Sequence, residues 1–386
     1  LRFPGFDEPW KVFKAEELFQ NITDKNHPDE TVLTIIQGKG TLPREQAGRN
    51  IHYDDASLSN YKKVEQGDFI IHLRSFEGGL EMANEAGIVS PAYTILRCKR
   101  PHSSLFYDAY FHTDEFINHN LSKSVEGIRD GRQISYEAFK WLGIPYCEPT
   151  EQEKISNLFA ALNERIAKQR DLIEALKKYK RGVVRTLLSP KHCSIKNVKW
   201  TTSRIGDIGT FIKGAPLSKA DISLEGTPFI LYGELYTTYS EVISNVVRKT
   251  QASVDKQYYS QIGDVIIPTS GETPEEISTA SCVMLPDIIL AGDLNIYRCT
   301  QVDGRIMSYI LNHVVNDRIA RIAQGKSIVH VQAAEISKIE ITYPDSFSQK
   351  TIIAILAAIS DRIDQSNAEL RLLYELRKAL LQKLFI

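Results

Sequence analysis

The sequence predicts an internally repeated architecture in which two mixed α/β segments alternate with two long helices that pair as an antiparallel coiled coil. Three observations support this fold class. The length of 386 residues allows two to four domains. The chain matches itself when it is shifted by 197 residues, and a heptad-patterned stretch follows each mixed segment. The predicted order is a first α/β (α+β) domain over 1–149, a central helix over 150–189, a second domain over 190–344 and a C-terminal helix over 345–386.

The repeat is visible at specific positions. At the offset of 197, Tyr146 aligns with Tyr343 and Gln152 with Gln349, whereas residues 67–71 align with 263–267 at an offset of 196. A one-residue change of offset indicates a small insertion between diverged duplicates. We therefore expect two copies of one domain-plus-helix unit, related by an approximate two-fold axis.

The mixed segments contain short β-like runs bounded by turn residues. These runs cover 68–73, 93–96, 227–232 and 264–267, and residues 304–322 carry a helical pattern. Each mixed segment is therefore predicted to be α/β.

The two helical stretches have apolar residues at alternating steps of four and three, which is the spacing of a coiled-coil seam. The predicted pairing residues are Ile155, Phe159, Leu162, Ile166, Ile173 and Leu176 in the first helix, and Ile352, Leu356, Ile359, Ile363, Leu370 and Leu373 in the second. Both seams are interrupted at matching positions by a polar residue (Gln169, Ser366) and a cation (Lys180, Arg377), and such interruptions fix register and partner. The alternative is that each seam packs only on its own domain.

Composition narrows the cellular context. The formal net charge is −1, so the positive charge that binding to a nucleic acid requires would have to be local. The first helix, residues 150–185, carries nine basic and five acidic residues.

Five widely spaced cysteines without a C-x-x-C pair argue against disulfides and structural zinc, and fit a reducing cytoplasm. No apolar run is long enough to span a membrane, and the first residues show no signal peptide, although the missing initiator Met suggests that a few residues precede them.

A search for catalytic motifs finds none. The sequence lacks a dinucleotide-binding G-x-G-x-x-G, a zinc-binding H-E-x-x-H and an adenine-methyltransferase motif. We therefore predict no metal site, no cofactor and no enzymatic activity for this chain alone.

Several segments resemble those of the DNA specificity (S) subunits of type I restriction-modification systems. The segments are LRFPGF (1–6), GDFIIHLRSFEGG (67–79), EQEKI (151–155), GTFIKG (209–214) and PFILYG (228–233), and the order of parts agrees over the whole chain. The resemblance implies two target-recognition domains that each read one half of a bipartite double-stranded DNA target, and spacer helices that set the gap and dock two modification (methyltransferase) subunits. It also implies that S-adenosylmethionine, ATP and magnesium are used by the modification and restriction (nuclease/translocase) subunits.

Base reading in the major groove needs hydrogen-bonding side chains on loops. The loops after the two matched strands and the local basic positions are the candidates. The predicted DNA-binding residues are Lys39, Arg44, Arg74, Ser75, Lys213, Lys219, Thr269 and Ser270. The competing hypothesis keeps the architecture without DNA: a coiled-coil scaffold that binds other proteins.

Overall fold

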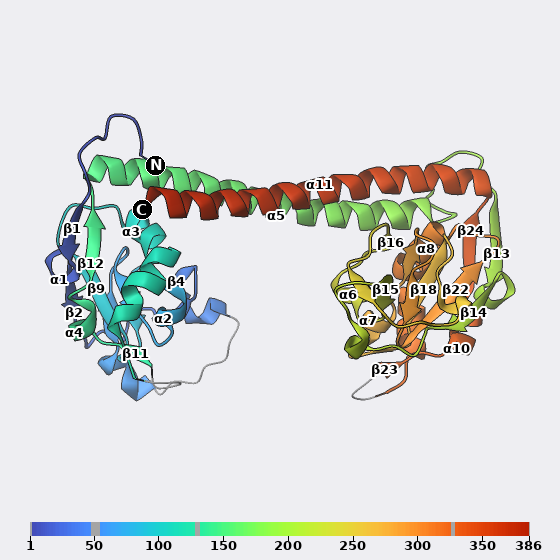
Figure 1. The fold of residues 1–386 in the computed structure, drawn as a ribbon, viewed down its shortest axis with the longest axis horizontal. Helices are drawn as coiled ribbons and strands as arrows, with labels where there is room; N and C mark the ends of the chain where they lie inside the picture. Colours follow the sequence, from blue (N-terminus) through green and yellow to red (C-terminus); the bar gives the residue numbers. More distant parts are fainter. Residues whose placement is uncertain (1, 48–54, 128–131, 326–328, 386) are drawn as a thin grey trace. The chain divides into compact units, whose positions relative to one another are not determined.

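The computed structural model describes residues 2–47, 55–127, 132–325 and 329–385. The chain forms two compact units: unit 1 comprises Leu1–Asp171 and Ala368–Ile386, and unit 2 comprises Leu172–Asn367. Helices α5 (Pro149–Leu187) and α11 (Ser346–Leu384) each contribute to both units. Each unit therefore combines one α/β domain with a segment of each long helix (Figure 1). Leu1, in the first of the family-like segments, lies outside the described residues.

The α/β domain of unit 1 is built on a four-stranded antiparallel sheet with the order β2-β9-β6-β7. Two-stranded pairs β1-β12, β3-β4, β5-β8 and β10-β11 surround this sheet. The strands are β1 (Lys11–Lys14), β2 (Phe19–Ile22), β3 (Leu33–Ile36), β4 (Gly40–Pro43), β5 (Lys62–Val64), β6 (Phe69–Ile71), β7 (Glu81–Met82), β8 (Gly87–Val89), β9 (Thr94–Cys98), β10 (Val125–Glu126), β11 (Gln133–Ile134) and β12 (Gly143–Tyr146). The helices are α1 (Ala15–Leu18), η1 (Arg44–Ala47), η2 (Asp55–Asn60), α2 (Ser75–Gly78), α3 (Ser104–Phe111), η3 (Glu115–Asn120), η4 (Leu121–Ser124) and α4 (Tyr136–Phe139).

Aromatic side chains fill the core of unit 1 between this sheet and α3. Phe19 and Phe69 from the sheet meet Tyr107 and Phe111 from α3, with ring centroids 4.9–6.4 Å apart. Phe385, at the end of the chain, packs on α3 and also stacks on Phe159 of α5 at 6.3 Å. The long helices therefore share the hydrophobic core of the domain in this unit.

Unit 2 contains a five-stranded sheet, β14-β22-β18-β20-β16, and a three-stranded sheet, β17-β15-β21. Its strands are β13 (Trp200–Arg204), β14 (Gly209–Lys213), β15 (Thr227–Leu231), β16 (Val242–Ile243), β17 (Arg248–Thr250), β18 (Asp264–Pro268), β19 (Ser270–Gly271), β20 (Ser281–Val283), β21 (Ile289–Ala291), β22 (Leu294–Cys299), β23 (Val329–His330) and β24 (Glu340–Pro344). Its helices are η6 (Ile205–Asp207), η7 (Lys219–Asp221), α6 (Glu234–Thr237), η8 (Lys256–Tyr258), α7 (Pro274–Ile277), α8 (Gly304–His313), α9 (Asn316–Ile322) and α10 (Ala333–Ser337).

The five-stranded sheet is buried on both faces, which explains the continuous apolar run of β18. Ile267 and Tyr297 on one face pack with α8 and the long helices, whereas Ile266 and Ile296 on the other face pack with β15 and β21. The residues 304–322 are helical as predicted, and they form two helices, because Val314 and Val315 separate α8 from α9. Val315 is itself buried in the core.

The long helices run antiparallel in each unit, as the heptad pattern predicts. In unit 1, Arg165 of α5 pairs with Glu369 of α11 at 2.5 Å, and Arg377 Nε donates to Asn163 Oδ1 at 3.0 Å. In unit 2, Val184 and Leu187 share a core cluster with Ile352 and Leu356. Most pairing residues are buried, while Leu176, Ile359, Leu370 and Leu373 are half-buried.

Two sets of contacts occur at corresponding places in both units. Arg97 binds the buried Asp68 at 2.8 Å in unit 1, and Arg298 binds the buried Asp264 at 3.1 Å in unit 2. Both carboxylates also accept a backbone N–H three residues upstream, at 2.8 and 2.9 Å. The aligned strands β6 and β18 are therefore fixed by the same ion pair.

The aligned glutamines attach each long helix to its domain. Gln152 donates to Cys147 O at 2.8 Å and accepts the Ser103 N–H at 3.0 Å. Gln349 donates to Pro344 O at 2.8 Å and accepts the Asp303 N–H at 2.8 Å. The predicted fold class is confirmed: two α/β copies with two long helices, repeated down to individual hydrogen bonds.

Candidate nucleic-acid interface

Unit 2 contains a hollow of about 940 Å³ beside the end of its five-stranded sheet. Lys213, at the end of β14, and Thr269, directly after β18, both line it. His330 of β23 and Gln332, the residue before α10, line the same hollow. The structure thus brings two of the predicted DNA-binding residues together with two polar residues that the sequence analysis did not select.

A second hollow, of about 750 Å³, adjoins the first, since Leu217, Gly292 and Asp293 line both. Lys219, at the start of η7, is exposed at this second hollow. Arg248 lines it as well, and its guanidinium binds the buried Glu234 at 2.7 Å. The two hollows together present Lys213, Lys219 and Arg248 on one concave surface of unit 2.

Ser270 has a structural role at this surface. It is 5% exposed, and its hydroxyl donates to Asp293 Oδ2 at 3.0 Å. The backbone of Thr269 links the neighbouring segments, because its N–H donates to Asp293 O and its carbonyl accepts from Val331 N. Ser270 therefore has little surface to offer to a ligand, while the half-buried Thr269 lines the hollow.

In unit 1, the exposed Lys39 lies in the tight turn between β3 and β4. The buried carboxylate of Glu81 accepts the N–H of Gly38 at 2.6 Å and that of Gly40 at 2.9 Å, on either side of Lys39. Both glycines have positive φ, of 72° and 76°, so the turn needs residues without a side chain there. Asn84 Nδ2 donates to Lys39 O at 2.8 Å, and the Lys39 backbone is thereby fixed.

Glu81 remains charged because of its hydrogen bonds. Burial opposes ionisation, but bonds from His112 at 3.3 Å and from the two glycine N–H groups lower the pKa of Glu81. Burial also opposes the charge on His112, yet the bond to Glu81 and the nearby Asp108 raise the pKa of His112. A buried ion pair thus supports the Lys39 turn.

The other predicted residues of unit 1 differ in exposure. Arg74 is exposed directly before α2, whereas Ser75 is fully buried and its hydroxyl accepts the His72 N–H at 2.9 Å. Arg44 is half-buried in η1, and its Nε lies 3.5 Å from Thr34 Oγ1. Lys39, Arg44 and Arg74 therefore remain the surface candidates in this unit.

Three further properties of the described ranges bear on function. No three His, Cys, Asp or Glu side chains there come close enough to hold a metal ion. No helix in the same ranges is both long and apolar enough to cross a membrane. All five cysteines are free.

Comparison with protein families identifies the second half of the chain. Residues 197–373, which span β13 to α11, match the family described as Type I restriction modification DNA specificity domain. The match confirms the resemblance to specificity subunits that the sequence predicts. A search of curated proteins gave no match.

Solved specificity subunits have a similar fold over the whole chain. The HsdS subunit from Thermoanaerobacter tengcongensis is 16% identical with a TM-score of 0.50, covering 100% of this chain and 97% of its own. The S subunit of the type I system from M. genitalium is 15% identical with a TM-score of 0.57, at 100% and 98% coverage. A chain from a study of complex assembly and conformational transition in the type I R-M system is 15% identical with a TM-score of 0.62, at 100% and 99% coverage. The first half of this chain therefore shares the specificity-subunit fold as well.

Proposed function

We propose that this chain is the non-catalytic DNA specificity subunit of a type I restriction-modification complex, in which residues 1–149 and 190–344 are target-recognition domains that each read one half of a bipartite target. The observation that carries the proposal is the repeat: the Arg–Asp ion pair of unit 1 recurs in unit 2, and most residues of unit 2 lie in the stretch 197–373 that matches the DNA specificity domain family. The two scaffolds agree while their surface loops differ. Two similar scaffolds with different loops suit two different half-targets.

The helices are proposed to set the gap between the half-targets. α5 and α11 each contain 39 residues, which corresponds to about 58 Å of helix at 1.5 Å per residue. Most of their seam residues are buried, in unit 1 as well as in unit 2. A helix pair of this kind is stiff enough to act as a spacer.

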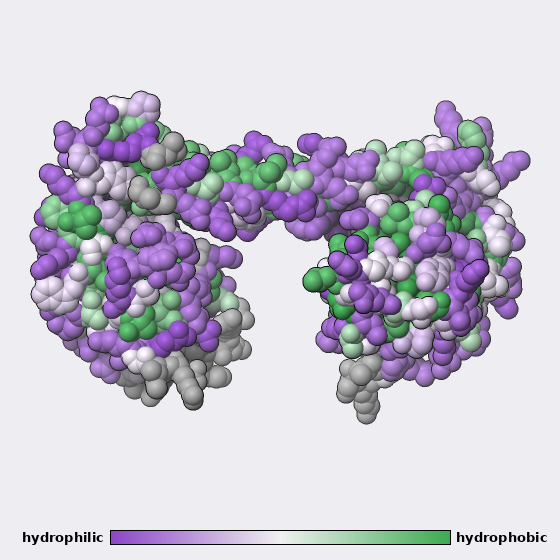
Figure 2. All heavy atoms as spheres, in the orientation of Figure 1, coloured by the Kyte–Doolittle hydropathy of each residue, from purple (hydrophilic) through white to green (hydrophobic). Residues whose placement is uncertain are grey.

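Modification subunits are proposed to dock on apolar helix faces that the repeat supplies twice. Tyr179 of α5 is 61% exposed beside an apolar hollow in unit 2 that Val183 and Ile355 also line. At the offset of 197, Leu376 of α11 takes its place in unit 1 and is 49% exposed. Figure 2 shows hydrophobic residues among hydrophilic ones along the long helices. Exposed apolar patches of this kind mark protein interaction sites, and two faces fit two modification subunits.

The number of modification subunits that bind to variants of the helix faces tests this docking proposal. Tyr179→Asp and Leu376→Asp should each reduce the bound modification subunits from two to one in mass photometry of the reconstituted complex, and the double variant should bind none. Leu224→Asp, at a residue that is 95% exposed in unit 2 away from the helices, is the control and should still bind two. Unchanged binding in both single variants would place the docking surface elsewhere.

The catalytic chemistry belongs, in this proposal, to the partner subunits. S-adenosylmethionine, ATP and magnesium would be bound by modification and restriction subunits, and the complex would act in the cytoplasm. This chain would contribute DNA recognition and assembly only.

Methylome sequencing tests the proposal directly. Cells that carry this gene and the modification partner should show a two-part adenine-methylation motif with a fixed gap, absent from cells that lack only this gene. A complex that forms but yields no gene-dependent motif would favour the coiled-coil scaffold. Affinity for DNA should also fall steeply with salt, which a scaffold that binds only proteins would not show.

A further inference from the structure

The larger hollow of unit 2 contains a buried hydrogen-bond donor without a partner. Asn295 of β22 lines this hollow opposite Lys213 of β14 and beside Ile267 of β18 in the sheet register. It is 2% exposed, and its Nδ2 finds no acceptor among the residues that the structure describes. A buried amide donor that is left unpaired destabilises a protein, so such a group in a hollow points to a bound acceptor.

The polar groups around Asn295 suit a base edge better than a phosphate. Lys213 and the Asn295 amide donate, Gln332 can donate and accept, and Thr269 can do both. Asp293, which is exposed at the same hollow, carries a negative charge that would repel a phosphate. Base edges in the major groove present donors and acceptors side by side, whereas phosphates present acceptors only.

We propose that this hollow reads bases of the second half-target, with Gln332 contacting an adenine, Lys213 contacting a guanine, and Asn295 supplying a further donor at its floor. The inference rests on the proposed function and deepens it. Amide side chains pair with the N6 and N7 edge of adenine, and cationic side chains pair with the O6 and N7 acceptors of guanine. Gln332 and Lys213 are therefore specificity-determining residues in our assignment.

Methylation motifs of single variants test the assignment in the reconstituted modification complex. Gln332→Ala and Lys213→Ala should each relax one position of the second half-target and leave the first half-target unchanged. Affinity for the original site should fall about tenfold or more in each variant. Gln251→Ala and Lys249→Ala are matched controls, because both residues are exposed in unit 2 and line neither hollow; they should leave the motif unchanged.

Two outcomes would overturn the assignment. An unchanged motif with uniformly weaker binding and a smaller salt dependence would make Lys213 a phosphate contact. An unchanged motif and unchanged affinity in both variants would remove the hollow from recognition, while the wild-type motif would still support the proposed function. If the wild-type complex gave no motif, the proposed function and this inference would fall together.

Asn295 is tested by separating stability from binding. Asn295→Leu keeps the branching and the number of heavy atoms of the side chain and removes the unpaired donor, so its melting temperature should equal or exceed that of the wild type while affinity for the cognate site falls several-fold. The reverse result, a lower melting temperature with unchanged affinity, would show that Asn295 serves the fold alone.

Discussion

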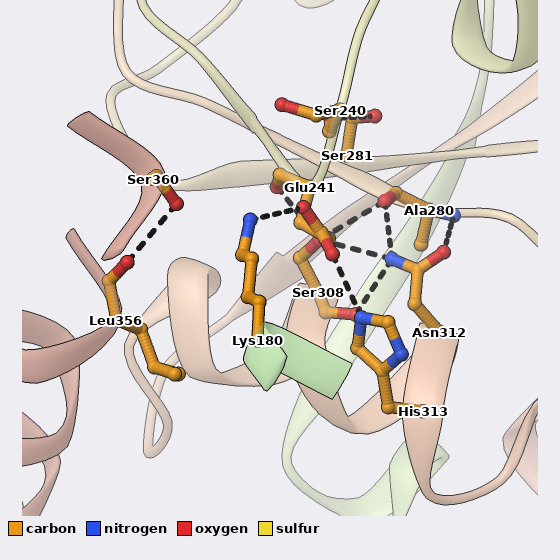
Figure 3. A network of polar contacts seen from close by, with 10 residues as sticks. All are labelled: Lys180, Ser240, Glu241, Ala280, Ser281, Ser308, Asn312, His313, Leu356 and Ser360. Carbon is orange, nitrogen blue, oxygen red and sulfur yellow. Dashed lines mark hydrogen bonds and ion pairs between the residues drawn. The ribbon is translucent and has the colours of Figure 1, made fainter. Parts of the chain in front are cut away.

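Replacement of Lys180 by Met should weaken the attachment of α5 to the domain of unit 2. Lys180 Nζ binds Glu241 Oε2 at 2.8 Å, and His313 Nε2 lies 2.7 Å from the other carboxylate oxygen (Figure 3). The Lys180 and Glu241 side chains are only 11% and 15% exposed. Around them, Ser308 donates to Glu241 O at 2.7 Å, and Asn312 donates to Ala280 O at 2.6 Å. The ion pair therefore lies within a largely buried polar network.

The pKa of Glu241 gives the magnitude. Burial opposes its charge, but His313 and Lys180 lower its pKa from 4.5 to about 2. One pKa unit corresponds to about 1.4 kcal/mol, so the charged carboxylate contributes about 3 kcal/mol to folding. Lys180 is one of two partners, so Lys180→Met should lower the free energy of unfolding of unit 2 by about 2 kcal/mol.

Lys177 supplies the matched control on the same helix. It pairs with Glu174 at 2.9 Å, but the two side chains are 46% and 69% exposed, and Lys177→Met should cost less than about 0.5 kcal/mol. Native-state hydrogen exchange of α8 in increasing urea would measure both variants. Because the folded-state pKa of Glu241 is lowered, its contribution is complete above pH 4.5 and disappears as the pH falls toward 2. Equal effects of the two substitutions at pH 7 would refute the reasoning.

Three further predictions concern the repeat and unit 1. Phe385→Ala should destabilise unit 1 by about 3–5 kcal/mol in urea unfolding, because this buried ring packs on α3 and α5; a loss below about 1 kcal/mol would contradict that packing. Gln152→Ala and Gln349→Ala should cost similar amounts, about 2–3 kcal/mol each, in their own units, since each leaves one backbone carbonyl and one N–H unpaired; hydrogen exchange that responds to only one of them would contradict the equivalence. The Glu81–His112 pair should stabilise unit 1 fully only between about pH 4.5 and 6.5, because the Glu81 pKa is lowered and the His112 pKa is raised in the folded protein. The stabilisation is lost as the pH falls through the folded-state pKa of Glu81 or rises through the folded-state pKa of His112. Melting temperatures of wild type and His112→Gln that differ by a constant amount from pH 3 to 9 would exclude this contribution.

Much of the scaffold could be predicted from the sequence because its signals are local. The heptad spacing predicts a central helix over 150–189, and α5 covers Pro149–Leu187. The apolar run 264–267 predicts a strand, and β18 covers Asp264–Pro268. The repeat could be found because the same buried contacts constrain the same positions in both halves, as Gln152 and Gln349 show.

The candidate interface could be predicted only in part, since it is assembled from distant segments. Lys213 and Thr269 could be selected as a basic position and a loop after a matched strand, but nothing in the sequence links them to Gln332, which reaches the same hollow from the segment before α10. Residue type also fails to separate binding from structural roles. Ser75 and Ser270 stand in the predicted loops, yet their hydroxyls bind within the fold.

The interrupted heptads show the same limit in the helices themselves. Lys180 and Arg377 occupy equivalent seam positions, and a cation in a seam requires an oxygen partner. Lys180 finds it in Glu241, a residue of the loop before β16, whereas Arg377 finds it in Asn163 on the opposite helix. The interruption therefore fixes helix to domain in unit 2 and helix to helix in unit 1. The sequence pattern predicts that each cation is anchored, but the partner depends on which loop the fold brings to it, and the loops are where the two copies have diverged.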